Sequence, residues 1–332
     1  MKAAVYRRYG AADQVAIAAV QQPQPSANQL LIRVAATCLN SADIRLRRLQ
    51  VPLGFGLISR LVFGITAPRR TILGVDLAGT VEAVGSQVTN FQPGDRVMAL
   101  TGMTMGAHAE YVCLNEKSAI ALMPRNLDFH QAAALVFGGS TALDFLRRGH
   151  LTAGETIAIN GAGGAVGCAA IQLARHYGAQ VTAICSASKR DLVRHLGATE
   201  VVDYQQEDFT RSGERYDLIM DTRGNAPWAE SRRALAPAGR LLAVCATLPQ
   251  MLQALILPLW QRERVIAGPC AERAQDLAEL ARLAEAGVLQ AVIDRVYPLS
   301  QITEAHRYVE QGHKQGSVVI SMIDQHQPCN GG

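Results

Sequence analysis

The segment Gly161-Ala162-Gly163-Gly164-Ala165-Val166-Gly167 decides how the rest of this 332-residue chain is interpreted. It follows an apolar, β-branched run over residues 156–160 and opens a stretch of helical character, 165–177, that stops at Gly178. A strand, a glycine turn and a helix in this order predict a dinucleotide site, because bare backbone and free helical N–H groups can approach a pyrophosphate. The spacing Gly-x-x-Gly-x-x-Gly departs from the strict fingerprint, and a turn that only links two elements is the alternative.

The second strand of this unit, residues 180–185, bears on the choice of cofactor. An acidic side chain at its end would bind the ribose 2′-hydroxyl of NAD, yet no Asp or Glu occurs from Gly161 through Arg190. Ser186, Lys189 and Arg190 follow the strand and can hold a 2′-phosphate by charge-assisted hydrogen bonds. The sequence therefore predicts NADPH rather than NADH. A solvated helix start is the alternative for Lys189 and Arg190.

The pattern of the chain outside the turn predicts two domains. Over residues 124–268, apolar runs of strand length alternate with helical segments, which is typical of an α/β doubly wound parallel sheet. Residues 1–123 consist of short apolar runs separated by Pro, Gly, Asn and Asp, so this part is expected to be β-rich. One helix and two strand-like runs follow in residues 269–332, which are expected to return to the first domain.

Composition restricts the possible partners and location. The net charge of +4 is mild and spread out, so no nucleic-acid partner is expected. The seven cysteines never form a Cys-x-x-Cys pair, which favours reduced thiols and argues against a Cys-rich zinc site. The N-terminus becomes charged before an apolar leader could form, and about 18 uncharged apolar residues never occur in a row. We therefore expect a cytoplasmic protein.

Further motifs stand in a specific order on both sides of the turn. They are Asn40-Ser41-Ala42-Asp43, residues 74–85 (GVDLAGTVEAVG), Pro93-Gly94-Asp95-Arg96-Val97, Gly106-Ala107-His108-Ala109-Glu110-Tyr111 and Gly316-Ser317-Val318-Val319-Ile320. Together with the glycine turn they resemble the medium-chain dehydrogenase/reductase superfamily, and within it the zinc-independent, quinone-oxidoreductase-like branch. The resemblance covers nearly the whole chain. It implies a GroES-like β-barrel catalytic domain with a Rossmann NADPH-binding domain inserted before the C-terminal segment.

The resemblance also locates the positions at which zinc-dependent relatives carry metal ligands. Gly74-Val75-Asp76 stands where those enzymes have Gly-His-Glu, and Asn40 stands at the position of the first cysteine ligand. Both are poor ligands for zinc, which prefers thiolate and imidazole. The structural zinc lobe is missing as well, since only Cys113 lies near that segment. No metal is therefore expected. None of the eight tyrosines precedes a lysine at the spacing Tyr-x-x-x-Lys, which a short-chain dehydrogenase would need.

These absences leave hydride delivery from NADPH to an activated acceptor, a quinone or an α,β-unsaturated carbonyl, whose own carbonyl spreads the developing charge. The resemblance implies that Asn40 and Thr141 lie near the nicotinamide, Tyr204 near the adenine ribose, and Val244 and Cys245 beside the cofactor. An Asx turn is the alternative role for Asn40. The candidate cofactor-binding residues are thus Thr141, Gly161, Gly163, Gly164, Ala165, Val166, Gly167, Ser186, Lys189, Arg190, Tyr204, Val244 and Cys245, and Asn40 is the candidate catalytic residue.

Two apolar stretches are particular to this chain. Between Arg45 and Arg70 six arginines and no acid alternate with apolar runs, which predicts an apolar mouth over the substrate cleft and suggests contact with anionic lipid. A helix packed into the barrel core is the alternative. The run from Leu248 to Trp260 is too short to span a bilayer and is expected to form a dimer contact or a cleft wall, so we expect a homodimer. For Arg223, a surface salt bridge is favoured over a contact with a cofactor phosphate.

A non-catalytic NADPH-binding protein is the alternative from another functional class, because a fold does not fix chemistry. A zinc alcohol dehydrogenase ranks below it. Oxidation of NADPH by a quinone or enone would distinguish the first two possibilities, and stoichiometric zinc would favour the third.

Overall fold

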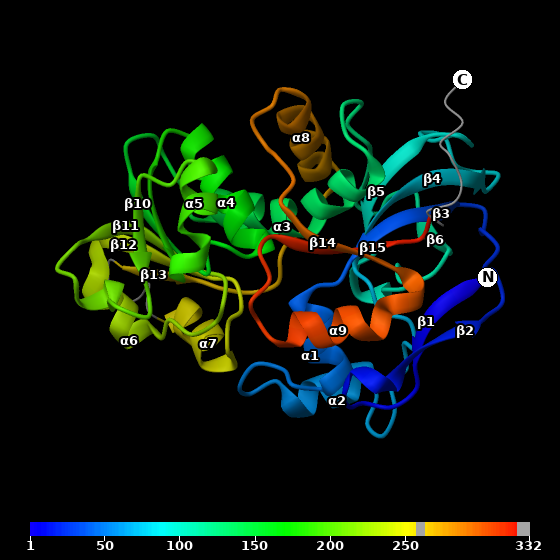
Figure 1. Cartoon of the computed structure of the whole chain (residues 1–332), viewed down its shortest axis with the longest axis horizontal. Coiled ribbons are helices and arrows are strands. Elements are labelled where there is room, and N and C mark those ends of the chain that lie inside the picture. Colours follow the sequence, from blue (N-terminus) through cyan, green and yellow to red (C-terminus); the bar gives the residue numbers. More distant parts are fainter. Residues whose placement is uncertain (257–262, 324–332) are drawn as a thin grey trace.

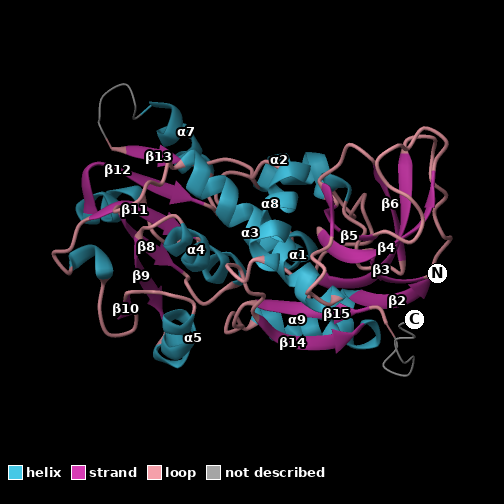
Figure 2. Ribbon diagram, turned by 90° about the horizontal axis from the view of Figure 1, so that it is seen from above, coloured by secondary structure: helices cyan, strands magenta, loops and turns pink. Residues whose placement is uncertain are grey.

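The structure is a computed structural model that describes residues 1–256 and 263–323. Two sheet-containing regions lie side by side, one at the left and one at the right of Figure 1. The long helix α3 (Phe129–Arg148) runs between them, as the view from above in Figure 2 shows. Asp128 begins this helix with a capping box, since its side chain accepts a hydrogen bond from the backbone N–H of Gln131.

The first region is a six-stranded parallel sheet. Its strands are β8 (Thr156–Asn160), β9 (Gln180–Cys185), β10 (Glu200–Asp203), β11 (Tyr216–Asp221), β12 (Leu235–Ala243) and β13 (Arg264–Ile266). Their spatial order is β10-β9-β8-β11-β12-β13, the order of a doubly wound dinucleotide-binding sheet. The direction of winding reverses beside β8, where such sheets bind their ligands. The helices of this region are α4 (Ala165–His176), α5 (Arg190–His195), α6 (Trp228–Ser231) and α7 (Leu248–Ile256).

The second region is a seven-stranded sheet with a separate two-stranded ladder. The sheet contains β3 (Gln29–Cys38), β4 (Asp76–Val84), β5 (Arg96–Leu100), β6 (Tyr111–Asn115), β7 (Ile120–Leu122), β14 (Ile293–Pro298) and β15 (Ser317–Ser321). The ladder pairs β1 (Lys2–Tyr6) with β2 (Val15–Ala19). The helices are α1 (Ser41–Arg48), α2 (Gly56–Phe63), α8 (Ala274–Glu285) and α9 (Ile302–Glu310).

The end of the chain joins the sheet formed by its beginning. Strand β15 pairs antiparallel with β3, so that Val319 lies opposite Cys38. Strand β14 adds to the far side of β15 in parallel. The predicted fold class, a GroES-like region combined with a parallel Rossmann sheet, is confirmed. The boundaries proposed at residues 123/124 and 268/269 stay predictions.

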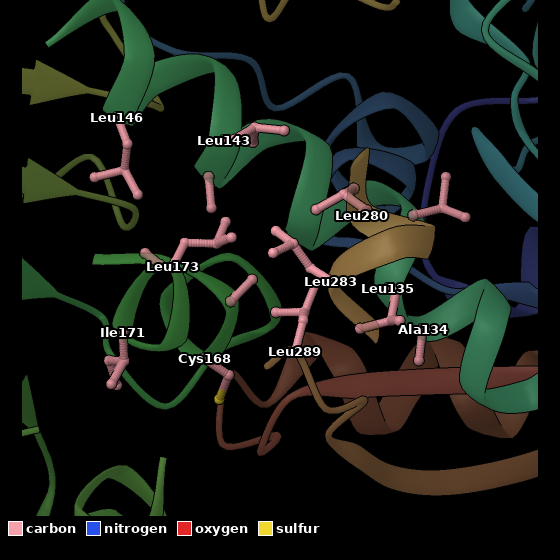
Figure 3. Packing of buried hydrophobic residues seen from close by; sticks show 14 of the residues in the cluster. Ala134, Leu135, Leu143, Leu146, Cys168, Ile171, Leu173, Leu280, Leu283 and Leu289 are labelled. Atoms are coloured by element: carbon pink, nitrogen blue, oxygen red, sulfur yellow. The ribbon is translucent and has the colours of Figure 1, made fainter. Parts of the chain in front are cut away.

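The largest core cluster ties α3 to both of its neighbours. Leu143 of α3, Leu173 of α4 and Leu280 of α8 are buried and point into one cluster in Figure 3. Fully burying each of these side chains stabilises the fold by roughly 1.5–3 kcal/mol. A Cβ on Gly138 would lie 2.6 Å from the backbone oxygen of Ala165, so α3 approaches the start of α4 as closely as glycine permits. This contact fixes the helix that carries Thr141 against the glycine turn.

For the segment between Arg45 and Arg70 the sequence left two possibilities, an apolar mouth over the cleft and a helix packed into the barrel core. It does form a helix, α2, but Leu57 and Leu61 on that helix are 72% and 53% exposed. The alternative of a helix packed into the barrel core is therefore wrong. The second apolar run begins as α7, and its remainder from residue 257 to Trp260 lies outside the described residues. Across residues 1–256 and 263–323, no helix combines the length and the apolar character that crossing a bilayer requires.

Candidate active site

A cavity of about 900 Å³ opens between the two regions. One wall comes from the glycine turn and the ends of β9, β11 and β12. The opposite wall comes from α1, the segment leading into α2, and the segment between α9 and β15. Helix α3 closes the base with Phe137, Thr141 and Phe145. The volume of the cavity lies near the upper end of the range that is usual for ligand sites, so the cavity can hold both an extended cofactor and a second molecule.

The glycine turn needs its glycines for backbone geometry. Gly161 has a φ of 81°, in the left-handed region that side chains disfavour. A Cβ on Gly163 would lie 2.4 Å from Cδ of Lys189, and one on Gly167 would lie 2.4 Å from the carbonyl oxygen of Gly161. Among the described residues, no side chain caps the N-terminus of α4. Free N–H groups and a positive helix end therefore face the cavity, which suits the pyrophosphate of a dinucleotide.

Three cations, Lys189, Arg223 and Lys314, line the cavity beside this turn. Together with Ser186 and Tyr204 they form what we call the cationic end of the cavity. The Arg223 guanidinium lies 5.2 Å from the centre of the Tyr204 ring. Lys189 donates a hydrogen bond from Nζ to the carbonyl oxygen of Lys314 at 2.7 Å. Burial lowers the pKa of both lysines; the nearby charge of Arg223 lowers that of Lys189 further, and Lys189 lowers that of Lys314. A bound phosphate would compensate this crowding of positive charge, because an anion favours the charged form of both ammonium groups.

The other part of the cavity is lined by Val51, Pro52, Phe55, Phe137 and Met251, and we call it the apolar end. Here the two regions of the molecule touch directly. Arg45 of α1 donates a hydrogen bond from Nη1 to Sγ of Cys245, which follows β12, at 3.1 Å. The backbone N–H of Leu248 donates to the carbonyl oxygen of Leu53 at 3.0 Å. Apolar, half-enclosed walls of this kind bind a flat hydrophobic molecule.

Asn40 is held by contacts behind the cavity wall. It precedes α1 in a capping box, with its backbone N–H donating to Oδ2 of Asp43 at 2.8 Å. Its Nδ2 donates to Oδ2 of Asp76 at 2.8 Å, and the backbone N–H of Cys38 donates to Oδ1 of Asp76. Burial raises the pKa of Asp76 to about 7 despite these hydrogen bonds. These contacts give Asn40 a structural role at the start of α1, of the kind that the Asx-turn alternative describes, and leave its role toward a substrate untested.

The segment that leads into α8 contributes a thiol and a carboxylate. Cys270 and Glu272 both line the cavity. Burial raises the pKa of the Cys270 thiol to about 12, so this thiol is neutral at physiological pH. Burial also raises the pKa of Glu272, which carries the one carboxyl group among the described lining residues. The cavity therefore holds little negative charge of its own.

The structure brings most of the predicted cofactor-binding residues to this cavity. Thr141, Gly161, Gly163, Gly164, Ala165, Val166, Ser186, Lys189, Tyr204, Val244 and Cys245 line it, together with Asn40. Gly167 packs behind the turn, and Arg190 is exposed at the start of α5 without lining the cavity. The expected surface salt bridge of Arg223 is wrong, since among the described residues this side chain pairs with no carboxylate and lies over Tyr204.

Sequence reasoning missed the contribution of the segment between α9 and β15. His313 and Lys314 line the cavity, and the backbone N–H of Gly316 donates to the carbonyl oxygen of Gly163. In the sequence, Lys314 is more than 100 residues away from Lys189, the lysine that it contacts. The motif at residues 316–320 identifies the strand that follows this segment, and it is the one feature of the sequence that points to the segment.

Within the described residues, no group of three or more His, Cys, Asp or Glu side chains is arranged to hold a metal ion. At the positions that correspond to zinc ligands, Asn40 bonds Asp76 and Val75 contributes an aliphatic side chain. This donor set does not suit zinc.

Comparisons with known proteins agree with this architecture. Residues 26–125 match the family described as alcohol dehydrogenase GroES-like domain, and residues 196–320 match the family described as zinc-binding dehydrogenase. The chain is 34% identical to the NADPH-dependent alkenal/one oxidoreductase of Arabidopsis thaliana chloroplasts, over 97% of this chain and 80% of that protein. It is 33% identical to the 2-methylene-furan-3-one reductase of Solanum lycopersicum, over 97% and 79%.

Solved structures give the same result. The quinone oxidoreductase of Coxiella burnetii superposes with a TM-score of 0.88 at 28% identity, covering 97% of this chain and 99% of that one. The site and fold thus define an oxidoreductase that uses a nicotinamide dinucleotide. The chain belongs to the medium-chain dehydrogenase/reductase superfamily, in its quinone oxidoreductase and alkenal/one reductase branch.

Proposed function

We propose that this protein uses NADPH to reduce a quinone or the C=C bond of an α,β-unsaturated carbonyl, without zinc. One observation carries the proposal: a single cavity joins the glycine turn and the cationic end to an apolar end. The first part suits a phosphorylated dinucleotide and the second a hydrophobic acceptor.

The preference for NADPH rests on charge. The end of β9, where an NAD-specific site carries an acid, offers Cys185 and Ser186, and both line the cavity. Lys189 and Arg223 lie on the same side, with Lys314 facing them. Ammonium and guanidinium groups bind a 2′-phosphate by charge-assisted hydrogen bonds. With NADH, these cations would lack an anionic partner.

The chain's own residues act mainly by position. A bound nicotinamide supplies the hydride, and the apolar end orients the acceptor against it. Thr141 and Asn40 line the cavity, where they are candidates for contacts near the nicotinamide. No phenol lines the apolar end among the described residues, so the proton for the reduced acceptor is expected from water.

A screen of NADPH consumption tests the proposal. The purified protein is mixed with quinones, enals and enones, with NADH as the parallel cofactor and a chelator in a third series. We expect turnover of at least one acceptor class, a preference for NADPH, and no loss of activity with the chelator. Absence of turnover with every acceptor favours the non-catalytic alternative, and loss of activity on chelation restores a metal enzyme.

The homodimer and the cytoplasmic location stay predictions. Light scattering on the purified protein tests the first, and fractionation of its native cells tests the second.

A further inference from the structure

Helix α2 has the reverse of the usual polarity of a surface helix. Its one buried residue is the polar Ser59, whereas Leu57, Ile58, Leu61 and Val62 are exposed by 72%, 47%, 53% and 49%. Surface helices normally turn their aliphatic stripe toward the core. An exposed aliphatic stripe on a folded protein marks a surface that something else covers.

The exposed aliphatic residues continue onto α7, and we call the combined face the α2–α7 surface. Figures 1 and 2 both place α7 beside the loop that precedes α2, and the hydrogen bond between Leu248 and Leu53 joins them. The members of the surface are Leu53, Leu57, Ile58, Leu61, Val62 and Ile65 with Leu252, Leu255 and Ile256. The same segments also line the apolar end of the cavity, through Val51, Phe55 and Met251.

The charged residues of the segment from 45 to 70, which carries α2, are all of one sign. Arg48, Arg60, Arg69 and Arg70 are exposed, and no residue from 45 to 70 is acidic. Among the described residues, none of these four arginines forms an ion pair. Arg60 and Arg69 bond only backbone carbonyl oxygens of their own segment, those of Ile65 and Val62.

We propose that the α2–α7 surface docks on an anionic lipid membrane. Aliphatic side chains would enter the headgroup boundary, and the arginines would lie at the level of the lipid phosphates. Symmetric pairing of α2 with a second copy fits less well, because it would bring these arginines against each other with no acid in the segment to separate them. Docking in this way would place the mouth of the cavity at the membrane, where a lipophilic acceptor concentrates. That last consequence rests on the proposed function, whereas the docking itself does not.

Vesicle co-sedimentation of the full-length protein tests the proposal without reference to activity. The vesicles contain phosphatidylcholine alone or phosphatidylcholine mixed with phosphatidylglycerol, each at low and high salt. We expect binding to the anionic vesicles that high salt weakens, because salt screens the arginines. Binding to pure phosphatidylcholine is expected to be much weaker.

A matched pair of double variants tests whether the α2–α7 surface is the part of the protein that binds the vesicles. Leu61→Ser with Arg60→Gln changes α2, and Leu122→Ser with Arg125→Gln makes the same exchange on and after β7, where Leu122 is 58% exposed. The first variant should lower the partition onto anionic vesicles about tenfold or more, and the second should leave it unchanged. Unchanged thermal unfolding shows that both remain folded.

Two outcomes overturn the proposal. One is equal, negligible binding of the unaltered protein to both kinds of vesicle. The other is a self-association, measured by sedimentation velocity, that the α2 variant abolishes in a protein that does not bind vesicles. The second outcome would assign the α2–α7 surface to a second copy of the chain. Neither outcome bears on turnover of NADPH, so failure here remains distinct from failure of the proposed function.

Discussion

The two ends of the cavity are built on different principles. At the cationic end, charged side chains are held by specific contacts within the protein: Lys189 bonds the carbonyl oxygen of Lys314, and the Arg223 guanidinium lies over Tyr204. At the apolar end, Phe55 and Met251 offer area and shape without a directed polar group. Directed charges discriminate between ligands that differ by one phosphate, whereas apolar walls discriminate weakly between molecules of similar size. The comparison therefore predicts strict choice of cofactor and broad choice of acceptor.

The largest expected effect concerns the buried carboxyl that supports Asn40 at the wall. Burial raises the pKa of Asp76 in the folded state to about 7, above its ordinary value of 3.8. The folded protein thus holds this proton more tightly, so the stabilising contribution is complete below about pH 4 and is lost as the pH rises through about 7. A difference of this size corresponds to roughly 4 kcal/mol of unfolding free energy.

Asp76→Asn, which does not titrate, should flatten the pH dependence of stability between those two values. Urea unfolding at several pH values measures this, with Asp191→Asn, an exposed carboxyl at the start of α5, as the control. If the stability curves of the Asp76 variant and the unaltered protein run parallel across this window, Asp76 does not ionise there.

The next effect concerns the glycine turn behind the cationic end. In Gly167→Ala the new Cβ would lie 2.4 Å from the Gly161 carbonyl oxygen and 2.6 Å from Cα of Ala162, and backbone cannot move aside cheaply. Overpacking of this kind costs roughly 1–3 kcal/mol. The Kd for NADPH should therefore increase by a factor of about 10 to about 100.

Fluorescence titration gives this Kd. Gly56→Ala serves as the control, because its Cβ would meet no atom of the described residues within 4 Å. Equal affinity of the Gly167 variant and the unaltered protein, both folded, would mean that the turn does not carry the cofactor.

The smallest effect is expected at the apolar end. Phe55→Ala removes a half-buried ring from the wall, and losing about half of its burial corresponds to roughly a tenfold lower kcat/KM for a bulky lipophilic acceptor. Affinity for NADPH should stay the same. Phe91→Ala removes a half-buried ring elsewhere and is the control. A fall in NADPH affinity with no change toward the acceptor would reverse the assignment of the two ends.

The sequence predicted those parts of the site that depend on residues close together in the chain. Strand β9 covers the expected residues 180–185, and α4 begins at Ala165 as the glycine turn indicated. Contacts made by a distant return of the chain were out of reach, as for Lys314. Arg190 followed the same strand as Lys189, yet the turn of α5 carries it away from the cavity.

The exposed face of α2 shows a further limit of prediction from sequence. Its apolar composition fits both a core helix and a surface helix, because hydrophobicity alone does not state which side faces the protein. Only packing against the neighbouring elements decides this, and it leaves Leu57 outside and Ser59 inside.

The most direct test of the central claim is the ratio of kcat/KM for NADPH to kcat/KM for NADH, measured with one turned-over acceptor. We predict a strong preference for NADPH in the unaltered protein. In Lys189→Gln this ratio should decrease by a factor of about 10 to about 100, because kcat/KM for NADPH falls. A hydrogen bond to a charged group is worth roughly 1.5–3 kcal/mol. The exposed Lys117→Gln should leave the ratio unchanged. Equal use of NADH and NADPH by the unaltered protein, or a ratio that Lys189→Gln does not move, would contradict the assignment of the cationic end.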